Sequence, residues 1–150
     1  MPEYFNKKEA TKEALWVDSQ GVHWLRTGDI GYLDENGYLY IVDRKKDMIL
    51  SGGQNVYPQD IEAVMACHED VKDVAVVGVK SQKWGETPLA VIAAKNGSID
   101  KEALRSWTNA KVGKQQRIVD IDIVDEIPRN PNGKILKREL RKKYEGRLFD

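Results

Sequence analysis

The chain has 150 residues, 41% of them apolar and 32% charged, which is enough to close a hydrophobic core and too polar for a membrane protein. Its 24 basic and 24 acidic side chains cancel, which excludes the overall positive field of a protein that binds nucleic acid or an anionic membrane. A single cysteine, Cys67, excludes an intrachain disulfide framework, and apolar runs such as 74–79 are far too short for a transmembrane segment. We therefore expect a cytoplasmic protein, including positions at the surface of a membrane.

The first 42 residues predict a short helix followed by β structure. Residues 6–9 have the order of a capping box, so we expect a helix from Asn6 through about Leu15. Short strands are then predicted at 22–25, 30–33 and 38–42. Asn36-Gly37 favours a tight hairpin between the last two, because both residues tolerate positive φ. Three short strands rarely fold alone, so we expect them to extend a sheet that lies outside this chain, and their unpaired edge predicts dimerisation of the chain in isolation.

Residues 43–58 predict a joint between two bodies. The stretch begins with five consecutive charged residues, Asp43 to Asp47, and continues with three apolar ones. It then becomes a glycine loop, Ser51-Gly52-Gly53, and ends at Pro58. No single secondary-structure period fits this order, which favours a hinge with a short strand and a flexible loop beside it.

The remaining hundred or so residues predict an α+β fold. Pro58 is placed to begin a helix, and either Ser98 or Asp100 is placed to cap a second one. A last helix is expected around Leu136, Leu140 and Tyr144, which share one face. The buried strands are predicted at 73–80, 88–94 and 117–124. We expect a three-stranded sheet with helices, and a short two-stranded hairpin at the joint.

Lys134 is the first candidate for chemistry. It follows Pro128, Pro131 and Gly133, which stiffen the approach and let the backbone come close to a partner. A lysine presented at such a tip suits a phosphate or carboxylate as a point charge. The alternative is a solvated lysine that precedes a helix, and spacing alone favours that alternative.

Three polar positions near the joint have similar pairs of interpretations. Asp29 suits the two hydroxyls of a ribose, because an ionised carboxylate only accepts hydrogen bonds, or it bonds its own backbone in a turn. Arg44 can bind a diol or a phosphate through its forked guanidinium, and Lys46 can move with the backbone. The alternative is that both residues belong to a charged linker. The glycine pair lets a thin ligand pass, or it is an ordinary turn.

Other reactive residue types give weaker signals. Cys67 has no histidine at useful spacing and is predicted to be a packed thiol. His23 and His68 form no metal-binding pattern, so both are predicted to be structural. The basic run 137–147 shares a helix with an apolar stripe, which favours a solvated face over nucleic-acid binding.

Four motifs together resemble a known family. They are Arg26-Thr27-Gly28-Asp29-Ile30-Gly31, Gly37 to Asp47, Ser51 to Pro58, and Pro128 to Ile135. In this order and spacing they resemble the C-terminal part of the adenylate-forming (AMP-binding) enzymes, and most closely bacterial fatty-acyl-CoA synthetases, the long-chain fatty acid–CoA ligases. The resemblance implies that residues 1–43 end a large N-terminal AMP-binding domain and that 44–150 form a C-terminal lid domain.

The resemblance implies a reaction in two steps. A carboxylic acid, here a fatty acid, and ATP with Mg2+ give an acyl-adenylate, and coenzyme A then displaces AMP to give a thioester. Asp29 and Arg44 match the residues that bind the ribose, and Lys46 matches the hinge of the lid. Lys134 matches the catalytic lysine of adenylation. Ser51, Gly52 and Gly53 match the loop near the pantetheine arm of coenzyme A.

Two departures limit what the resemblance implies. The phosphate-binding loop, the adenine pocket and the acyl pocket are absent, so this chain alone is not expected to catalyse, and it carries no Mg2+ ligands. Some relatives have a lysine where Leu50 stands, and any role of that lysine does not transfer. A non-catalytic lid-like binding module and a lid that loads a carrier protein are the alternative interpretations.

Overall fold

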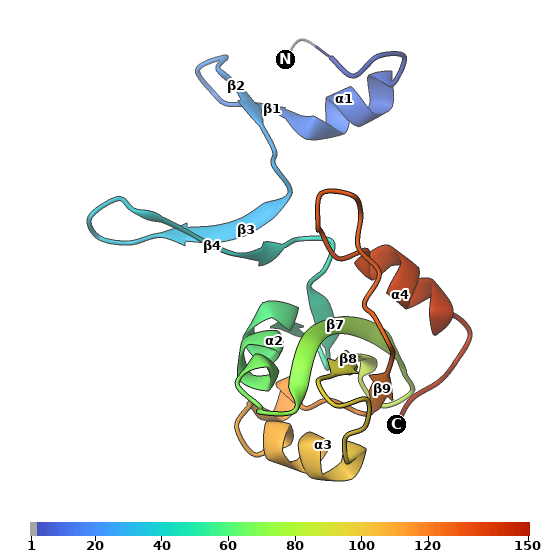
Figure 1. Ribbon diagram of the computed structural model, residues 1–150. Coiled ribbons are helices and arrows are strands. Elements are labelled where there is room, and N and C mark those ends of the chain that lie inside the picture. The colour runs from blue at the N-terminus through green and yellow to red at the C-terminus, as the bar shows by residue number, and fades with distance from the viewer. Residues whose placement is uncertain (1–2) are drawn as a thin grey trace. The chain divides into compact units, whose positions relative to one another are not determined.

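The structure, a computed structural model, describes residues 3–150 (Figure 1). The contacts divide the chain into two units, one that ends at Lys46 and one that comprises Asp47–Asp150. No helix within residues 3–150 is long and apolar enough to cross a membrane.

The first unit begins with helix α1, Lys8–Ala14. The predicted capping box is wrong: Asn6 has a φ of 53°, and Lys7 occupies the N-cap without a side-chain hydrogen bond. Thr11 fastens the helix start instead, because its Oγ1 accepts from the Tyr4 N–H at 2.9 Å and donates to the Lys7 carbonyl at 2.9 Å. Thr11 therefore ties the segment before the helix to its first turns, and Lys7 at the N-cap gives the helix no side-chain cap.

Two antiparallel ribbons follow in the first unit. Strand β1, Leu15–Val17, pairs with β2, His23–Leu25, and strand β3, Asp29–Leu33, pairs with β4, Leu39–Arg44. The sequence missed β1, since its three residues fall at the end of the helical pattern. Many large apolar side chains on both ribbons are exposed, among them Trp16, Trp24, Leu33, Leu39 and Ile41. Isolated two-stranded ribbons are marginal in water, so these faces need a cover.

The loop between β3 and β4 differs from the predicted turn. Gly37 has a positive φ of 83°, but Asn36 does not, so this is not a two-residue turn with both φ values positive. The Asp34 N–H donates to the Tyr38 carbonyl at 3.0 Å, which encloses a three-residue loop whose last residue is left-handed. Such loops are the next commonest hairpin connection.

The second unit contains a mixed five-stranded sheet. Its strands are β5, Ile49–Ser51; β6, Gln54–Val56; β7, Val71–Ser81; β8, Gly85–Ala94; and β9, Ile121–Ile123. Strand β8 is central. Strand β7 pairs with one edge of it in antiparallel orientation. The other edge pairs with β9 in parallel orientation and with the end of β5 in antiparallel orientation. The predicted α+β fold, three strands with helices plus a short hairpin, is confirmed.

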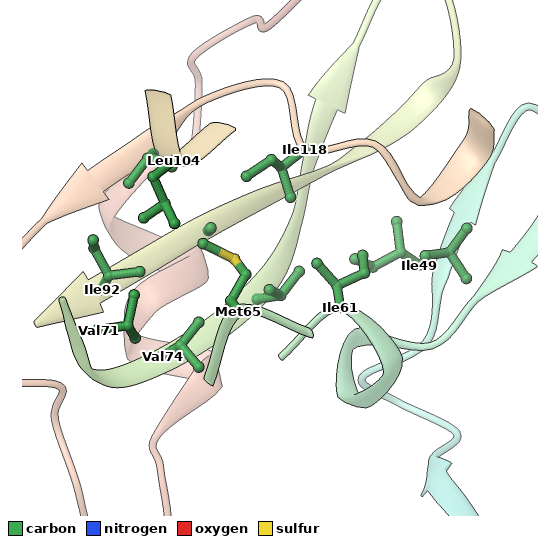
Figure 2. Close-up of a cluster of buried hydrophobic side chains, with 12 residues drawn as sticks. Ile49, Ile61, Met65, Val71, Val74, Ile92, Leu104 and Ile118 are labelled. Carbon is green, nitrogen blue, oxygen red and sulfur yellow. The ribbon is translucent and has the colours of Figure 1, made fainter. Parts of the chain in front are cut away.

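The sheet separates two hydrophobic cores. Helices α2, Pro58–Ala66, and α3, Lys101–Asn109, close one face, where Val74 and Ile92 point (Figure 2). Helix α4, Lys137–Lys143, and the C-terminus close the other, where Val77 and Val91 point. Because both faces of β7 and β8 are buried, their sequences are continuous apolar runs rather than alternating ones.

Two helix starts agree with the sequence. Pro58 is the first residue of α2, and Asp100 caps α3 by accepting from the Glu102 and Ala103 amides at 3.0 Å each. Between Ser98 and Asp100, which the sequence left open, the structure places Asp100 at the cap. The acceptor satisfies amides that have no partner within the helix.

The predicted strand 117–124 is wrong in its first half, since β9 begins at Ile121. Side chains of α3 form hydrogen bonds to the backbone of Ile118 and Val119 instead. Asn109 accepts from the Ile118 N–H at 2.8 Å and donates to its carbonyl at 3.0 Å, and Arg105 donates to the Val119 carbonyl at 2.8 Å. These bonds replace part of the ladder that a longer strand needs.

A carboxylate joins β9 to α4 and gives a pH-dependent prediction. Partial burial pushes the pKa of Asp122 upward, but hydrogen bonds from Lys143 Nζ and Tyr144 Oη, both at 2.6 Å, outweigh it and hold that pKa below its usual range. A depressed pKa stabilises the fold above about pH 4 and loses this contribution as the pH falls through the lowered value. We expect Asp122→Asn to cost about 1 kcal/mol of unfolding free energy at neutral pH.

Urea denaturation at pH 7 and at pH 3 measures this contribution. The difference between the two proteins is expected to shrink at the lower pH, because the wild-type carboxylate is then becoming protonated. Asp125→Asn, an exposed carboxylate on the same segment, is the matched control. An equal loss of stability at both pH values would contradict the assignment.

Candidate functional site

Asp29 and Arg44 lie opposite each other on paired strands. Arg44 Nε donates to Asp29 Oδ1 at 2.7 Å, and Arg44 Nη1 donates to the Thr27 carbonyl at 3.3 Å. The Asp29 side chain is 23% exposed and the Arg44 side chain 42%. The structure thus brings together two residues that the sequence selected separately. Asp29 uses its carboxylate for Arg44 here, and not for its own backbone as the turn interpretation supposed.

A β-bulge creates this pairing. Leu33 faces Leu39 and Gly31 faces Ile41, a register that would continue to Asp29 opposite Asp43. The register shifts between Ile30 and Gly31, so Asp29 meets Arg44 instead. A bulge re-aims side chains in this way next to functional sites. Without it, two carboxylates would stand opposite each other, which is unfavourable.

Gly31 is a residue that the sequence analysis did not single out. A Cβ atom built there would lie 2.5 Å from the Tyr40 carbonyl oxygen. Real Cβ atoms do not approach backbone that closely, so a side chain at this position would push β3 away from β4 beside the bulge. Glycine therefore contributes indirectly to the position of Asp29.

An open hollow adjoins the pair. It is lined by Thr27, Gly28, Arg44, Lys45 and Lys46. An ionised carboxylate accepts at two oxygens, so Asp29 retains acceptor capacity beyond its bond to Arg44. The arrangement of an oriented carboxylate, a guanidinium and two lysines suits a polar, anionic ligand that carries hydroxyl groups.

Lys46 lies at the boundary between the two units. Before it, the Lys45 N–H donates to the Gly28 carbonyl at 2.8 Å, within the first unit. After it, Asp47 is ion-paired with Arg141 of α4, within the second unit. Each neighbour of Lys46 is therefore fastened to a different unit. The hinge role itself stays a prediction.

The glycine loop is a tight hairpin turn. Gly52 and Gly53 have φ values of 57° and 81° and connect β5 to β6, with Ser51 paired to Gln54. Two successive positive φ values match the two-residue turn that twists with its strands. The Gly52 N–H is bonded within the unit, because it donates to the Trp84 carbonyl at 2.9 Å. Ser51 is buried, so only the two glycines lie at the surface.

The two glycines differ in their surroundings, which gives a matched pair of variants. A Cβ at Gly52 would lie 2.7 Å from Trp84 Cε3, whereas a Cβ at Gly53 would meet nothing within 4 Å. Both substitutions to alanine strain a positive φ, at a cost of about 1 kcal/mol. We expect Gly52→Ala to cost a further 1–3 kcal/mol, roughly, because it also overpacks against the indole.

Thermal or urea unfolding of the two variants checks this prediction. Gly53→Ala serves as the control, since it changes the backbone strain without the clash. Equal destabilisation of the two variants would show that the indole moves aside at little cost. In a Trp84→Ala background, Gly52→Ala is expected to cost no more stability than Gly53→Ala, because the indole that it would clash with is gone.

Lys134 ends a turn whose backbone is bonded and whose side chain is exposed. The Asn130 N–H donates to the Lys134 carbonyl at 2.9 Å, and the Lys134 N–H donates to Asn130 Oδ1 at 2.8 Å. Gly133, with a φ of 80°, donates to the Asn130 carbonyl at 2.8 Å. The turn lies three residues before α4 begins. A lysine on a fixed backbone with an exposed side chain can place its charge against a ligand.

Residues 60–134 match the model of the AMP-binding enzyme C-terminal domain. The chain belongs to this family.

The AMP-binding C-terminal domain has curated relatives among CoA ligases. The 2-succinylbenzoate–CoA ligase of Geobacillus kaustophilus is 45% identical over 140 residues, which cover 93% of this chain and 28% of that enzyme. The long-chain-fatty-acid–CoA ligase FadD13 of Mycobacterium tuberculosis is 42% identical over 144 residues, which cover 96% of this chain and 28% of that enzyme. The chain therefore spans little more than a quarter of the length of these relatives.

Solved structures show the same fold. ATP-bound MatB from Rhodopseudomonas palustris has a TM-score of 0.84 at 33% identity, covering 96% of this chain and 28% of that one. The o-succinylbenzoate CoA synthetase MenE of Bacillus subtilis, in complex with the acyl-adenylate intermediate OSB-AMP, has a TM-score of 0.81 at 34% identity, covering 94% of this chain and 28% of that one.

The remaining sequence predictions about reactive residues need two corrections. Cys67 is exposed rather than packed, and its thiol donates to the Ala63 carbonyl at 3.3 Å. The basic run of α4 is not simply solvated, because three of its members form ion pairs within the second unit: Lys137 with Glu62, Arg141 with Asp47, and Lys143 with Asp122. His68 packs edge-on against Trp107.

Proposed function

We propose that this AMP-binding C-terminal domain is part of an ATP-dependent acyl-CoA synthetase that forms an acyl-adenylate and then an acyl-CoA thioester. The observation that carries the proposal is the turn at 130–134, which bonds the backbone of Lys134 and leaves its ammonium exposed. The similarity to CoA ligases over 93% of the chain supports the same conclusion.

In the first half-reaction, Lys134 contributes a positive charge. A carboxylate oxygen attacks the α-phosphorus of ATP, the bond from that phosphorus to the bridging oxygen breaks, and pyrophosphate leaves. Negative charge on the oxygens around phosphorus must be stabilised as this occurs, and a positioned cation does so without reorganising in the transition state. Mg2+ bound to ATP would offset part of the negative charge of its phosphates, and this chain is not expected to supply its ligands.

Asp29 and Arg44 hold the nucleotide in this proposal. Asp29 accepts from the ribose hydroxyls, and Arg44 orients the carboxylate through the bond at 2.7 Å. Holding the sugar fixes the α-phosphate relative to the acid, and such positioning is a large part of catalysis in bimolecular reactions.

In the second half-reaction, the thiol of coenzyme A attacks the acyl carbon and AMP leaves. The lid rotates about Lys46 between the two steps, and the exposed Gly52-Gly53 turn then faces the pantetheine arm. Glycines suit this place, because a side chain would narrow the passage of a thin ligand.

Residues 1–43 end the large N-terminal domain in this proposal, and 44–150 form the lid. The exposed apolar faces of the two ribbons support it, since further strands of that domain would cover them. The adenine, phosphate and acyl sites come from the rest of that domain, so the chain by itself does not catalyse.

We propose that the carboxylic acid substrate is a fatty acid, on the basis of the similarity to FadD13. The relative with 45% identity is named for 2-succinylbenzoate instead. CoA consumption by the complete enzyme, with a long-chain fatty acid and with 2-succinylbenzoate in separate reactions, distinguishes the two acids.

A hybrid enzyme tests the proposed function. The chain replaces the corresponding C-terminal part of the Geobacillus kaustophilus ligase, and we refer to this protein as the hybrid ligase. It is expected to form the adenylate, measured by pyrophosphate exchange, and the CoA thioester with 2-succinylbenzoate. A folded hybrid that performs neither step would contradict the proposal and favour a binding module. Adenylation with transfer to a carrier protein but not to CoA would favour the carrier-loading alternative.

A further inference from the structure

Within residues 3–150, three turns share one hydrogen-bonding pattern. They are 18–22, 34–38 and 130–134, and we call them the Asx-Gly turns. In each, the first residue is Asp or Asn and its Oδ1 accepts from the amides two and four residues later, at 2.8–3.1 Å. In each, the fourth residue is a glycine with positive φ that donates to the first carbonyl, and the first N–H donates to the fifth carbonyl.

The third Asx-Gly turn differs from the others in two respects. Its first residue is Asn130, whereas the others begin with Asp18 and Asp34. The second carboxylate oxygen of those aspartates accepts from a ring six residues later, Trp24 Nε1 at 2.8 Å or Tyr40 Oη at 3.2 Å. The residue six positions after Asn130 is Leu136, which has no such donor.

Lys134 is the fifth residue of the third turn. Both of its main-chain polar groups are therefore bonded to Asn130, the N–H at 2.8 Å to the side chain and the carbonyl at 2.9 Å to the main chain. The two bonds fix the Cα atom of Lys134 and the direction in which its side chain leaves. The amide oxygen provides the same acceptor as the aspartates without adding a negative charge beside the lysine.

The turn is also fastened to the sheet. Arg129 Nη1 donates to the Gly133 carbonyl at 2.7 Å, and Arg129 Nη2 donates to Asp73 Oδ2 of β7 at 2.7 Å. Asp73 Oδ1 in turn accepts from the Val74 N–H at 3.0 Å. Because one guanidinium bonds both the turn and the strand, it holds the turn at a fixed place relative to β7.

We propose that Asn130 is a positioning residue for Lys134, and that the Arg129–Asp73 pair holds their turn on the sheet. The inference rests on the proposed role of Lys134 in adenylation. Asn130 does not touch the reacting atoms; it fixes the backbone from which the lysine reaches them. A displacement of about 1 Å in a catalytic group can cost roughly a hundredfold in rate.

The hybrid ligase tests this inference through its two half-reactions. Asn130→Ala is expected to lower kcat for pyrophosphate exchange by about tenfold to a hundredfold with little change in KM for ATP. Thioester formation from supplied acyl-adenylate is expected to stay within about twofold, because Lys134 acts only in adenylation. Asn130→Asp keeps the acceptor that two other turns use but adds a negative charge beside Lys134, so it is expected to recover part of the lost rate.

Two further variants keep the test decisive. Asp34→Ala removes the corresponding two bonds, together with the bond from Tyr40 Oη, from an Asx-Gly turn without a catalytic lysine, and it is expected to leave the ratio of the half-reactions unchanged. Asp73→Asn weakens only the fastening to β7, so it reports on the turn even if Asn130→Ala does not fold, and it is expected to slow adenylation selectively by several-fold.

The outcomes separate the inference from the proposed function. Normal exchange by Asn130→Ala, or equal slowing of both half-reactions, would overturn the positioning role while Lys134→Ala remained inactive in exchange. Normal exchange by Lys134→Ala would instead overturn the proposed role of the lysine itself.

Discussion

Replacement of Lys134 with alanine is expected to abolish acyl-adenylate formation in the hybrid ligase, with a loss of about a hundredfold to a thousandfold in kcat for pyrophosphate exchange. The ammonium is exposed and its backbone is fixed, so the substitution removes charge without removing a contact of the hydrophobic core. ATP binding is expected to change little, because the residues that we propose to hold the ribose, Asp29 and Arg44, belong to the other unit. Thioester formation from supplied acyl-adenylate is expected to persist.

Two control variants accompany this prediction. Lys142→Ala removes an exposed lysine from α4 and is expected to leave both half-reactions within about twofold. Lys134→Arg keeps the charge but replaces a compact ammonium with a planar fork, so it is expected to restore only part of the rate. Normal exchange by Lys134→Ala would refute the catalytic role. A parallel loss of ATP binding would point to a role in nucleotide affinity instead.

The sheet of the second unit follows from the sequence because its signal is local. Strands β7 and β8 contain continuous apolar runs, which are typical of a strand buried on both faces, and their short length favours a strand over a helix. Pro58 and Asp100 mark helix starts through constraints that act within one turn. The first unit is harder to predict, since Leu15-Trp16-Val17 extends a helical pattern although it forms β1.

The contacts that organise the candidate site are not local. The ion pairs of Asp47 with Arg141 and Glu62 with Lys137 join residues far apart in the sequence, and no spacing rule predicts them. The opposition of Asp29 and Arg44 depends on a bulge that shifts the register by one residue. Sequence patterns identified both residues but had no means of placing them against each other.

Lys134 shows the same division. The sequence predicts an exposed lysine on a stiff turn from its prolines and glycine. It does not show that Asn130 bonds both main-chain groups of the lysine, because an asparagine in a loop is compatible with many partners. The pattern that Asn130 shares with Asp18 and Asp34 consists of hydrogen bonds, so it is seen in the structure and not in the sequence.

The second large effect is expected at the proposed hinge, Lys46. We expect Lys46→Pro to change the ratio of the two half-reaction rates of the hybrid ligase by about tenfold or more. Lys46→Ala is expected to change this ratio by less than about threefold. Proline fixes φ near −65° and also restricts the preceding Lys45, so a rotation of the lid through these dihedrals is blocked. The position is exposed and lies in a turn between β4 and β5, where proline is tolerated better than inside a strand.

Measurement of pyrophosphate exchange and of thioester formation from supplied acyl-adenylate checks this prediction on the same protein samples. The half-reaction whose lid orientation suits a φ near −65° is expected to survive, and the other is expected to be lost. Lys46→Ala removes the same side chain and keeps the backbone free, so it separates loss of rotation from loss of the lysine. Equal effects of proline on both half-reactions would contradict a pivot at Lys46.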